Sequence, residues 1–240
     1  MSDSVLIEVI DASLAYPKPY GFNLKKLKTK HADRTVINTL KSFSLNIHSG
    51  MRIGVIGANG AGKTTLLRVL AGIYPISNGE IRHNTDSIST IIDGNLGFDP
   101  FLSGRDNIIL KCNLNGIHDN ALINKVCEDV YDFIELGDMF EYPIYTYSTG
   151  MFFRLAFAFA TSHQSDLVII DELIGSGDFK FAQKAKERMH NFLRNTSSLI
   201  MSSHSMELVT EYCQQGILIN DGVITLYENI EDCVNAYTGR

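Results

Sequence analysis

The sequence predicts an α/β protein, in which a largely parallel sheet is flanked by helices and a helical subdomain is inserted into it. Three observations predict this class. Short apolar segments of strand character alternate with segments of helical periodicity, which is typical of strand–helix–strand units. A glycine-rich turn at residues 57–62 joins one such strand directly to a helix. The stretch from about residue 102 to residue 164, by contrast, is mostly helical in pattern and forms the predicted insertion.

The first predicted elements are strands. Residues 5–14 alternate loosely between apolar and polar side chains, and a later β-rich stretch ends in a short buried strand at residues 51–56. The glycine-rich turn and a helix over residues 63–70 follow. Between the first two strands, residues 17–34 carry scattered basic side chains and few apolar ones. We expect an exposed loop or short helix there, which serves either as a solvated connector or as a contact for an acidic partner or lipid headgroups.

The remaining elements follow from the same patterns. Strand candidates lie at residues 79–82, 87–92, 167–170, 198–201, 216–219 and 223–226, and a last helical stretch covers residues 228–237. From residue 167 onward the strands alternate with helical stretches, which favours parallel neighbours in one sheet.

Composition excludes several classes of protein. A chain of 240 residues with 45% apolar and 20% charged residues can bury a sizeable core, so it is neither disordered nor a disulfide-dependent mini-protein. Its net charge of −6 argues against a general nucleic-acid binder. No signal peptide and no window suited to a membrane-spanning helix is apparent. The cysteines lie far apart, as expected of reduced thiols rather than a disulfide framework or zinc site: Cys112, Cys127, Cys213 and Cys233.

The glycine-rich turn carries the strongest functional signal. Residues 57–64 fit the pattern G-x-x-x-x-G-K-[ST], which follows a strand and opens a helix. Glycines let backbone N–H groups close around phosphate oxygens, and the helix points its positive dipole end at the same anion. Lys63 would reach the β- and γ-phosphates, and the Thr64 hydroxyl would bind Mg²⁺. The predicted nucleotide-binding residues of this loop are Gly57, Asn59, Gly60, Ala61, Gly62, Lys63, Thr64 and Thr65.

An apolar strand at residues 167–170 ends in two carboxylates, Asp171 and Glu172. Beside a phosphate-binding loop, an aspartate in this position holds Mg²⁺, and the adjacent glutamate is the natural general base for an attacking water. Side chains alternate along a strand, so one carboxylate can serve the metal and the other the water. Without the loop, the pair would be interpreted as an exposed acidic strand end.

In order and spacing, these residues resemble the ATP-binding subunits of ABC transporters. Tyr147-Ser-Thr-Gly-Met151 stands where that superfamily carries its signature. Downstream, residues 175–178 match the D-loop, and His204 matches the switch histidine, although a lone histidine is more often structural. The resemblance covers about residues 5–226.

Finer features resemble the ATPases that energise polysaccharide exporters. These are the form of the signature itself, the residues 154–158 that follow it, the run Gly97-Phe-Asp-Pro100 and the run Ser103-Gly-Arg-Asp-Asn107. The superfamily's Q-loop glutamine is absent. Asp93 stands where the export family tends to have glutamate, so the resemblance makes Asp93 a candidate metal or water contact.

The resemblance implies a P-loop ATPase core with an N-terminal antiparallel β subdomain and a helical subdomain at about residues 102–165. It implies one ABC ATP-binding domain over residues 1–240, and we expect no C-terminal carbohydrate-binding domain. ATP and Mg²⁺ would be the cofactors, sandwiched in a head-to-tail homodimer. Ser148, Thr149 and Gly150 would face the γ-phosphate held by the other subunit, and His204 would steady that phosphate. Tyr16, or failing that Tyr20, would stack on adenine.

The resemblance also implies partners and a place in the cell. The homodimer would lie at the cytoplasmic face of the inner membrane, as a peripheral ATPase beneath two copies of an integral-membrane permease. It would drive export of a lipid-linked polysaccharide such as O-antigen, with no nucleic-acid partner. The alternatives are an exporter ATPase for capsule, teichoic acid, a drug, a peptide or another lipid, and a soluble ABC protein of translation or DNA maintenance.

Aromatic residues in and near the predicted insertion either pack in the core or contact a partner protein. We expect Phe152, Phe153, Phe157 and Phe159 to serve mainly in packing. Phe98 is either a core residue or an exposed contact for the permease, because the family's groove for the membrane subunit lies near this loop.

Overall fold

The computed structural model describes residues 4–17, 36–85, 87–92, 97–171, 179–203 and 205–239, and its α/β class confirms the prediction. Two sheets form the framework. The central sheet has the strand order β5 (Ile88–Ile91), β6 (Leu167–Asp171), β7 (Leu199–Ser202), β3 (Arg52–Gly57), β8 (Gln215–Asn220) and β9 (Val223–Tyr227). Its strands are parallel except β9, which pairs antiparallel with β8. The smaller sheet is antiparallel, in the order β2 (Val36–His48), β1 (Val5–Pro17) and β4 (Asn78–His83).

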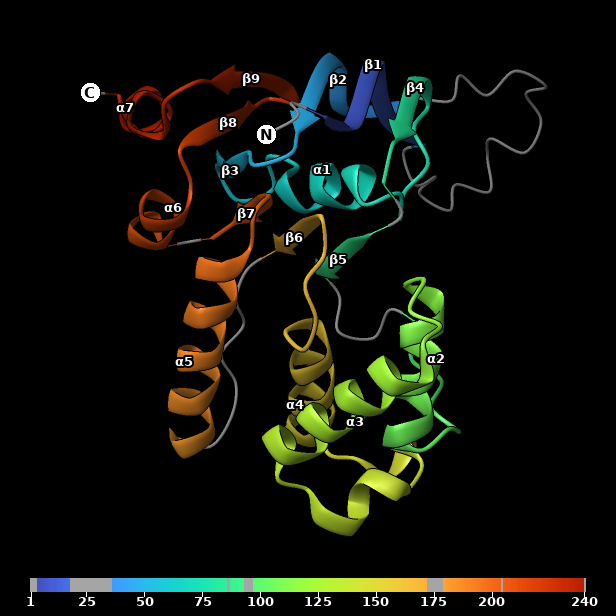
Figure 1. Cartoon of the computed structure of the whole chain (residues 1–240). Helices are drawn as coiled ribbons and strands as arrows, with labels where there is room; N and C mark the ends of the chain where they lie inside the picture. Colours follow the sequence, from blue (N-terminus) through green and yellow to red (C-terminus); the bar gives the residue numbers. More distant parts are fainter. Residues whose placement is uncertain are drawn as a thin grey trace, which may run out of the picture.

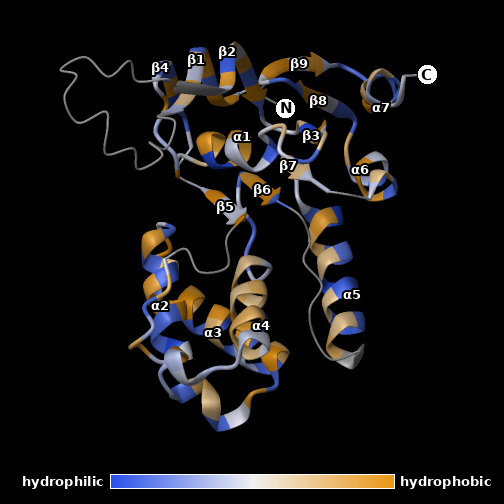
Figure 2. Ribbon diagram, turned by 180° about the vertical axis from the view of Figure 1, so that it is seen from behind, coloured by the Kyte–Doolittle hydropathy of each residue, from blue (hydrophilic) through white to orange (hydrophobic). Residues whose placement is uncertain are grey.

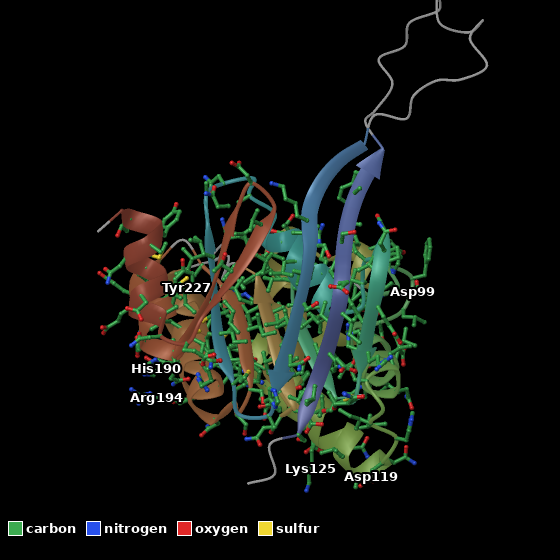
Figure 3. All side chains as sticks on the ribbon, turned by 90° about the horizontal axis from the view of Figure 1, so that it is seen from above. Asp99, Asp119, Lys125, His190, Arg194 and Tyr227 are labelled. Atoms are coloured by element: carbon green, nitrogen blue, oxygen red, sulfur yellow. The ribbon has the colours of Figure 1, made fainter. Side chains whose placement is uncertain are left out.

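Helix α1 (Lys63–Leu70) lies between the two sheets (Figure 1; seen from above in Figure 3). The alternation of side chains between the two faces of each strand explains this layering. In β6, Leu167 and Ile169 belong to the apolar cluster shared with α1 and the small sheet, whereas Val168 and Ile170 belong to the cluster on the opposite face. A strand that is buried on both faces is apolar throughout, as expected in a sheet with helices on either side.

Four helices contribute to the opposite face of the central sheet. These are α4 (Thr149–Ala160), α5 (Phe179–Asn195), α6 (Met206–Tyr212) and α7 (Ile230–Thr238). Two neighbouring glycines, Gly54 of β3 and Gly216 of β8, make room for α6 and α7. A Cβ atom on Gly216 would lie 2.4 Å from the Cβ of Cys233, and one on Gly54 would lie 2.3 Å from a methyl of Val209.

Replacing Gly216 with alanine is therefore expected to destabilise the fold by about 1–3 kcal/mol, because α7 must move away from the sheet. Thermal or urea unfolding followed by circular dichroism measures the change. Gly150→Ala is the control, because a Cβ there meets only the Ser148 hydroxyl oxygen, at 4.0 Å. Equal stability of the Gly216→Ala variant and the wild type would contradict this account of the packing.

The helical insertion is confirmed. It contains α2 (Gly104–Leu114), α3 (Asn120–Ile134), the 3-10 turns Gly137–Glu141 and Ile144–Thr146, and α4. Helix α4 is largely apolar along its length (Figure 2), and Phe157 and Phe159 are buried while Phe152 and Phe153 pack partly buried against the same core. These contacts confirm the packing role predicted for the four phenylalanines. None of the helices in the described ranges is long and apolar enough to cross a membrane.

Helix α5 is tied to the insertion by cationic side chains. Arg188 forms an ion pair with Asp129 of α3, and its Nε donates to the Thr161 hydroxyl at the end of α4, at 2.7 Å. Its guanidinium also lies over the Phe133 ring, 4.4 Å from the ring centroid. The C-terminal end of α4 is thereby held against both α3 and α5.

The four cysteines are free and buried, as expected of reduced thiols. Burial raises the pKa of Cys213 to about 12, and the pKa values of Cys112 and Cys233 to about 11; the pKa of Cys127 is raised too.

Because the thiolate is the nucleophile, we expect all four thiols to resist Ellman's reagent in the native protein at mildly alkaline pH. The same thiols should react rapidly in guanidinium chloride. Fast reaction of any one thiol before unfolding would contradict the burial described here.

Candidate phosphate-binding site

The glycine-rich turn forms a backbone cradle between β3 and α1. Gly60 and Gly62 have φ angles of +79° and +107°, in the left-handed region that favours glycine. A Cβ on Gly57 would lie 2.6 Å from the carbonyl oxygen of Ile219 on the neighbouring strand. Gly62 is the N-cap of α1, and no side chain caps this helix. The N–H groups of its first turn are thus left to bind an anion, as the sequence predicts.

Lys63 extends over the same cradle. Its ammonium donates to the carbonyl oxygens of Gly57, at 2.8 Å, and Ala58, at 3.1 Å. These bonds hold the charge above the start of the helix, where the backbone donors also point. A phosphate group bound in the cradle would meet both sources of positive potential.

The cradle opens into a cavity of about 320 Å³ that gathers residues from four parts of the chain. Its lining comprises Thr39, Asn59, Gly60, Gly62, Lys63, Thr64, Thr65, Asp171, Ser202 and Ser203. The structure thus brings Asp171 together with six of the eight loop residues predicted to bind nucleotide. Gly57 and Ala61 belong to the same turn but do not line the cavity.

The alternation of side chains along β6 places Asp171 on the face of the sheet that carries the glycine-rich loop and α1. Asp171 follows Leu167 and Ile169 at two-residue steps, and those residues face α1. It ends β6 at the carboxyl edge of the parallel sheet, the same edge from which β3 leads into the loop. Ligands of open α/β sheets bind outside this edge.

The donor set of the cavity fits Mg²⁺. The Thr64 hydroxyl and the Asp171 carboxylate are hard oxygen donors that line one cavity. Within the described ranges, no group of three or more histidine, cysteine or acidic residues could hold a metal ion. Two protein oxygens are what a site needs when substrate phosphates and water supply the remaining ligands.

Sequence reasoning missed three residues of the lining. Ser202 and Ser203 follow the apolar run 199–201, and polar residues at the carboxyl end of a buried strand were a usable signal. Thr39 had no such signal, because it belongs to β2 of the small sheet and meets the loop only in the folded chain. The two segments lie so close that a Cβ on Gly62 would be 3.4 Å from the Thr39 carbonyl oxygen.

Several predicted site residues lie outside the described residues. These are Asp93, Glu172, His204 and the D-loop residues 175–178, together with Tyr20 and most of the basic segment 17–34. Their assigned roles stay predictions.

The signature residues Ser148, Thr149 and Gly150 form a second helix start. Ser148 is the N-cap of α4, and its hydroxyl accepts a hydrogen bond from the Met151 N–H at 3.3 Å. The other end of α4 is the one that leads to β6 and the central sheet (Figure 1). Ser148 therefore lies at the end of α4 opposite the one that leads to β6, and none of the three residues lines the phosphate cavity.

Tyr16 lies near the end of β1 and does not line the cavity. Tyr16 is 39% exposed, and its ring makes an edge contact with the Tyr74 ring at 6.4 Å between centroids. The Tyr74 hydroxyl accepts a hydrogen bond from Arg68 at 2.7 Å. Burial, followed by the influence of Tyr74, raises the pKa of Tyr16. Stacking of Tyr16 on adenine stays a prediction.

A second cavity, of about 480 Å³, lies beside the start of the insertion. It is lined by Gly97, Phe98, Asp99, Pro100, Phe101, Leu110 and Leu114. Figure 3 places Asp99 at the outer edge of the molecule. We call this feature the Phe101 groove.

Phe98 combines features of both predicted roles, and its contact with a permease stays a prediction. Phe98 lines the groove and also packs edge-on against Phe152 at 5.2 Å, so it is half-buried. Phe101 is the exposed aromatic residue of the groove, with 78% of its surface accessible, and no pattern in the sequence distinguished it from Phe98. Asn107 stabilises the loop because its fully buried amide bonds to the backbone of Asp99 and Ser103.

Comparison with known proteins agrees with this geometry. The ABC transporter family profile matches residues 40–175. The O-antigen export system ATP-binding protein RfbE of Yersinia enterocolitica is 39% identical over 82% of this chain and 80% of its own length. The corresponding RfbB of Myxococcus xanthus is 35% identical over 82% of this chain but only 45% of its own length, so the chain spans less than half of that relative.

Solved structures show the same fold. A dimeric ATP-binding cassette in a post-hydrolysis state, bound to ADP and phosphate, superposes with a TM-score of 0.68 at 18% identity, over 93% of this chain and 98% of that one. Together with the family match and the export relatives, the phosphate cradle leads to one assignment. The chain belongs to the ABC transporter family, as an ATPase related to the ATP-binding proteins of polysaccharide export.

Proposed function

We propose that this chain is the ATP-hydrolysing subunit of an exporter that moves a lipid-linked polysaccharide, such as O-antigen, across the inner membrane. The ATPase part of this proposal rests on one observation, namely that Lys63, Thr64 and Asp171 line the same cavity. The polysaccharide part is supported by the names of relatives that export O-antigen.

The proposal assigns roles to residues that line the cavity and to three predicted residues outside the described ranges. The backbone of residues 57–62 and the start of α1 bind the phosphates, and Lys63 supplies a positive charge at the β- and γ-phosphates. Thr64 and Asp171 would hold Mg²⁺, which neutralises charge on the phosphates when bound. Asp93 is a further candidate contact to this ion or its water. Glu172 accepts the proton of the attacking water, and His204 donates a hydrogen bond to the γ-phosphate.

A head-to-tail homodimer would complete the site. The chain carries two helix starts suited to phosphate, at Gly62 and at Ser148, and they lie on different parts of the molecule. One chain cannot apply both to one nucleotide in this arrangement. In the proposed dimer, Ser148, Thr149 and Gly150 of one subunit face the γ-phosphate held by the loop of the other, so that ATP joins the two subunits.

The membrane partner would dock at the Phe101 groove. The described helices offer no membrane span, so export requires a partner that does. The groove combines an exposed aromatic ring with Leu110 and Leu114 and sits at the start of the helical insertion. Two permease copies above the ATPase dimer would receive its motion there, at the cytoplasmic face of the membrane. We propose no nucleic-acid partner.

One experiment separates the proposed exporter from its alternatives. The chain is expressed together with the permease subunit of a polysaccharide exporter, and ATP hydrolysis, membrane recruitment and glycan export are measured, with a photocrosslinker placed at Phe101 or Phe98. We expect crosslinks to the permease and loss of surface glycan when either gene is deleted. Export of another substrate would favour the capsule, teichoic acid, drug or lipid alternatives, and copurification with ribosomes or DNA would favour a soluble ABC protein.

A further inference from the structure

Ser202 breaks the apolar pattern of its strand. In β7 the residues Leu199, Ile200 and Met201 are all buried and apolar, and Ser202 is equally buried, with 2% of its surface exposed. An apolar side chain would suit this strand as well as its neighbours do. A buried hydroxyl needs a hydrogen-bond partner, because an unsatisfied polar group inside a protein costs free energy.

The partner of Ser202 is the Asp171 carboxylate. The strands β6 and β7 are parallel neighbours, and their register pairs Asp171 with Ser202 directly. Both side chains lie on the α1 side of the sheet, two residues beyond Ile169 and Ile200. The Ser202 hydroxyl donates a hydrogen bond to Oδ1 of Asp171, and both residues line the phosphate cavity.

The neighbouring serines form hydrogen bonds with backbone N–H groups and not with the carboxylate. The Ser203 hydroxyl accepts a hydrogen bond from the Ser205 N–H at 3.1 Å, at the turn into α6. Ser198, fully buried just before β7, accepts one from the Gly50 N–H at 3.0 Å. Of these three serines, Ser202 is the one whose hydroxyl is hydrogen-bonded to the Asp171 carboxylate.

We propose that Ser202 is a positioning residue for the metal site, which fixes the Asp171 carboxylate in the orientation that Mg²⁺ requires. The inference rests on the proposed function. A bond to Oδ1 prevents free rotation of the carboxylate and leaves its second oxygen for the metal or a metal-bound water. Partners of this kind change metal affinity by about 10–100-fold when they are removed.

The test compares two side chains of the same shape. Ser202→Thr keeps the hydroxyl and Ser202→Val replaces it with a methyl group, so any strain from the added volume is common to both. We expect Ser202→Val to raise the Mg²⁺ concentration for half-maximal hydrolysis, and to weaken Mn²⁺ binding to the ADP complex seen by electron paramagnetic resonance, by about 10–100-fold. Ser202→Thr should stay near the wild type, and metal-free ATP affinity should be unchanged in both.

Ser198→Ala is the matched control for loss of a buried serine hydroxyl at the other end of the strand. It should lower thermal stability without moving the Mg²⁺ midpoint. Equal midpoints for Ser202→Val and Ser202→Thr, or an equal loss of metal-free ATP affinity, would overturn the role of Ser202 and leave the proposed function intact. A wild type that binds no nucleotide with or without Mg²⁺ would overturn both.

Discussion

Replacing Glu172 with glutamine is expected to slow ATP hydrolysis by about 10²–10⁴-fold, because an amide cannot accept the proton of the attacking water. The change keeps the size of the side chain and leaves the phosphate cradle, Lys63 and Asp171 in place. ATP should therefore still bind, and since it is not consumed, it should hold two copies of the chain together. Steady-state phosphate release measures the first effect, and light scattering with and without Mg·ATP measures the second.

The control for this variant is Glu128→Gln, which makes the same chemical change at an exposed position of α3. It should leave both hydrolysis and ATP-dependent dimerisation at wild-type levels. Rapid hydrolysis by the Glu172→Gln variant would remove Glu172 as the base. Slow hydrolysis without dimers would retain the base and contradict the head-to-tail arrangement.

Replacing Lys63 with alanine is expected to weaken ATP binding by about 10–100-fold, which corresponds to the loss of hydrogen bonds to a charged group. The ammonium of Lys63 is held above the start of α1 by the carbonyls of Gly57 and Ala58, so it is placed for phosphate and not for the adenine or ribose. The loss should therefore be large for ATP and ADP and negligible for adenosine. Calorimetric titration of the three ligands measures it.

Two further variants serve as controls for the Lys63→Ala result, namely Lys63→Arg and Lys125→Ala. Arginine keeps the charge but is bulkier and branched, so we expect intermediate affinity. Lys125 is exposed on α3, at the outer edge of the molecule in Figure 3, and its replacement should change nothing. Equal affinity of Lys63→Ala and the wild type for ATP would show that the cradle binds phosphate through its backbone alone.

The phosphate cradle and the position of Asp171 beside it were predictable from the sequence because both depend on short stretches of chain. Gly60 and Gly62 are glycines since their φ angles require it, and Lys63 and Thr64 follow in the first turn of a helix that the local pattern already indicates. Asp171 was predictable because four apolar residues in a row predict a buried strand, and the residue after such a strand reaches the carboxyl edge of the sheet.

Other features depended on which strands and loops become neighbours. Thr39 enters the cavity because the small sheet lies over the loop. Phe98 packs against Phe152, whereas Phe101, three residues later, is exposed. Tyr16 lies beside Tyr74, a contact that bridges separate segments of the chain. No periodicity within either segment specifies such a pairing.

The α/β class, the glycine-rich turn and the place of Asp171 beside it could be predicted from the sequence alone, because these follow from backbone conformation and periodicity within a few residues. The contact between Ser202 and Asp171, by contrast, arises only when the chain folds. The two residues are 31 positions apart, and their contact exists because β6 and β7 become parallel neighbours in a register set by the packing of both faces of the sheet.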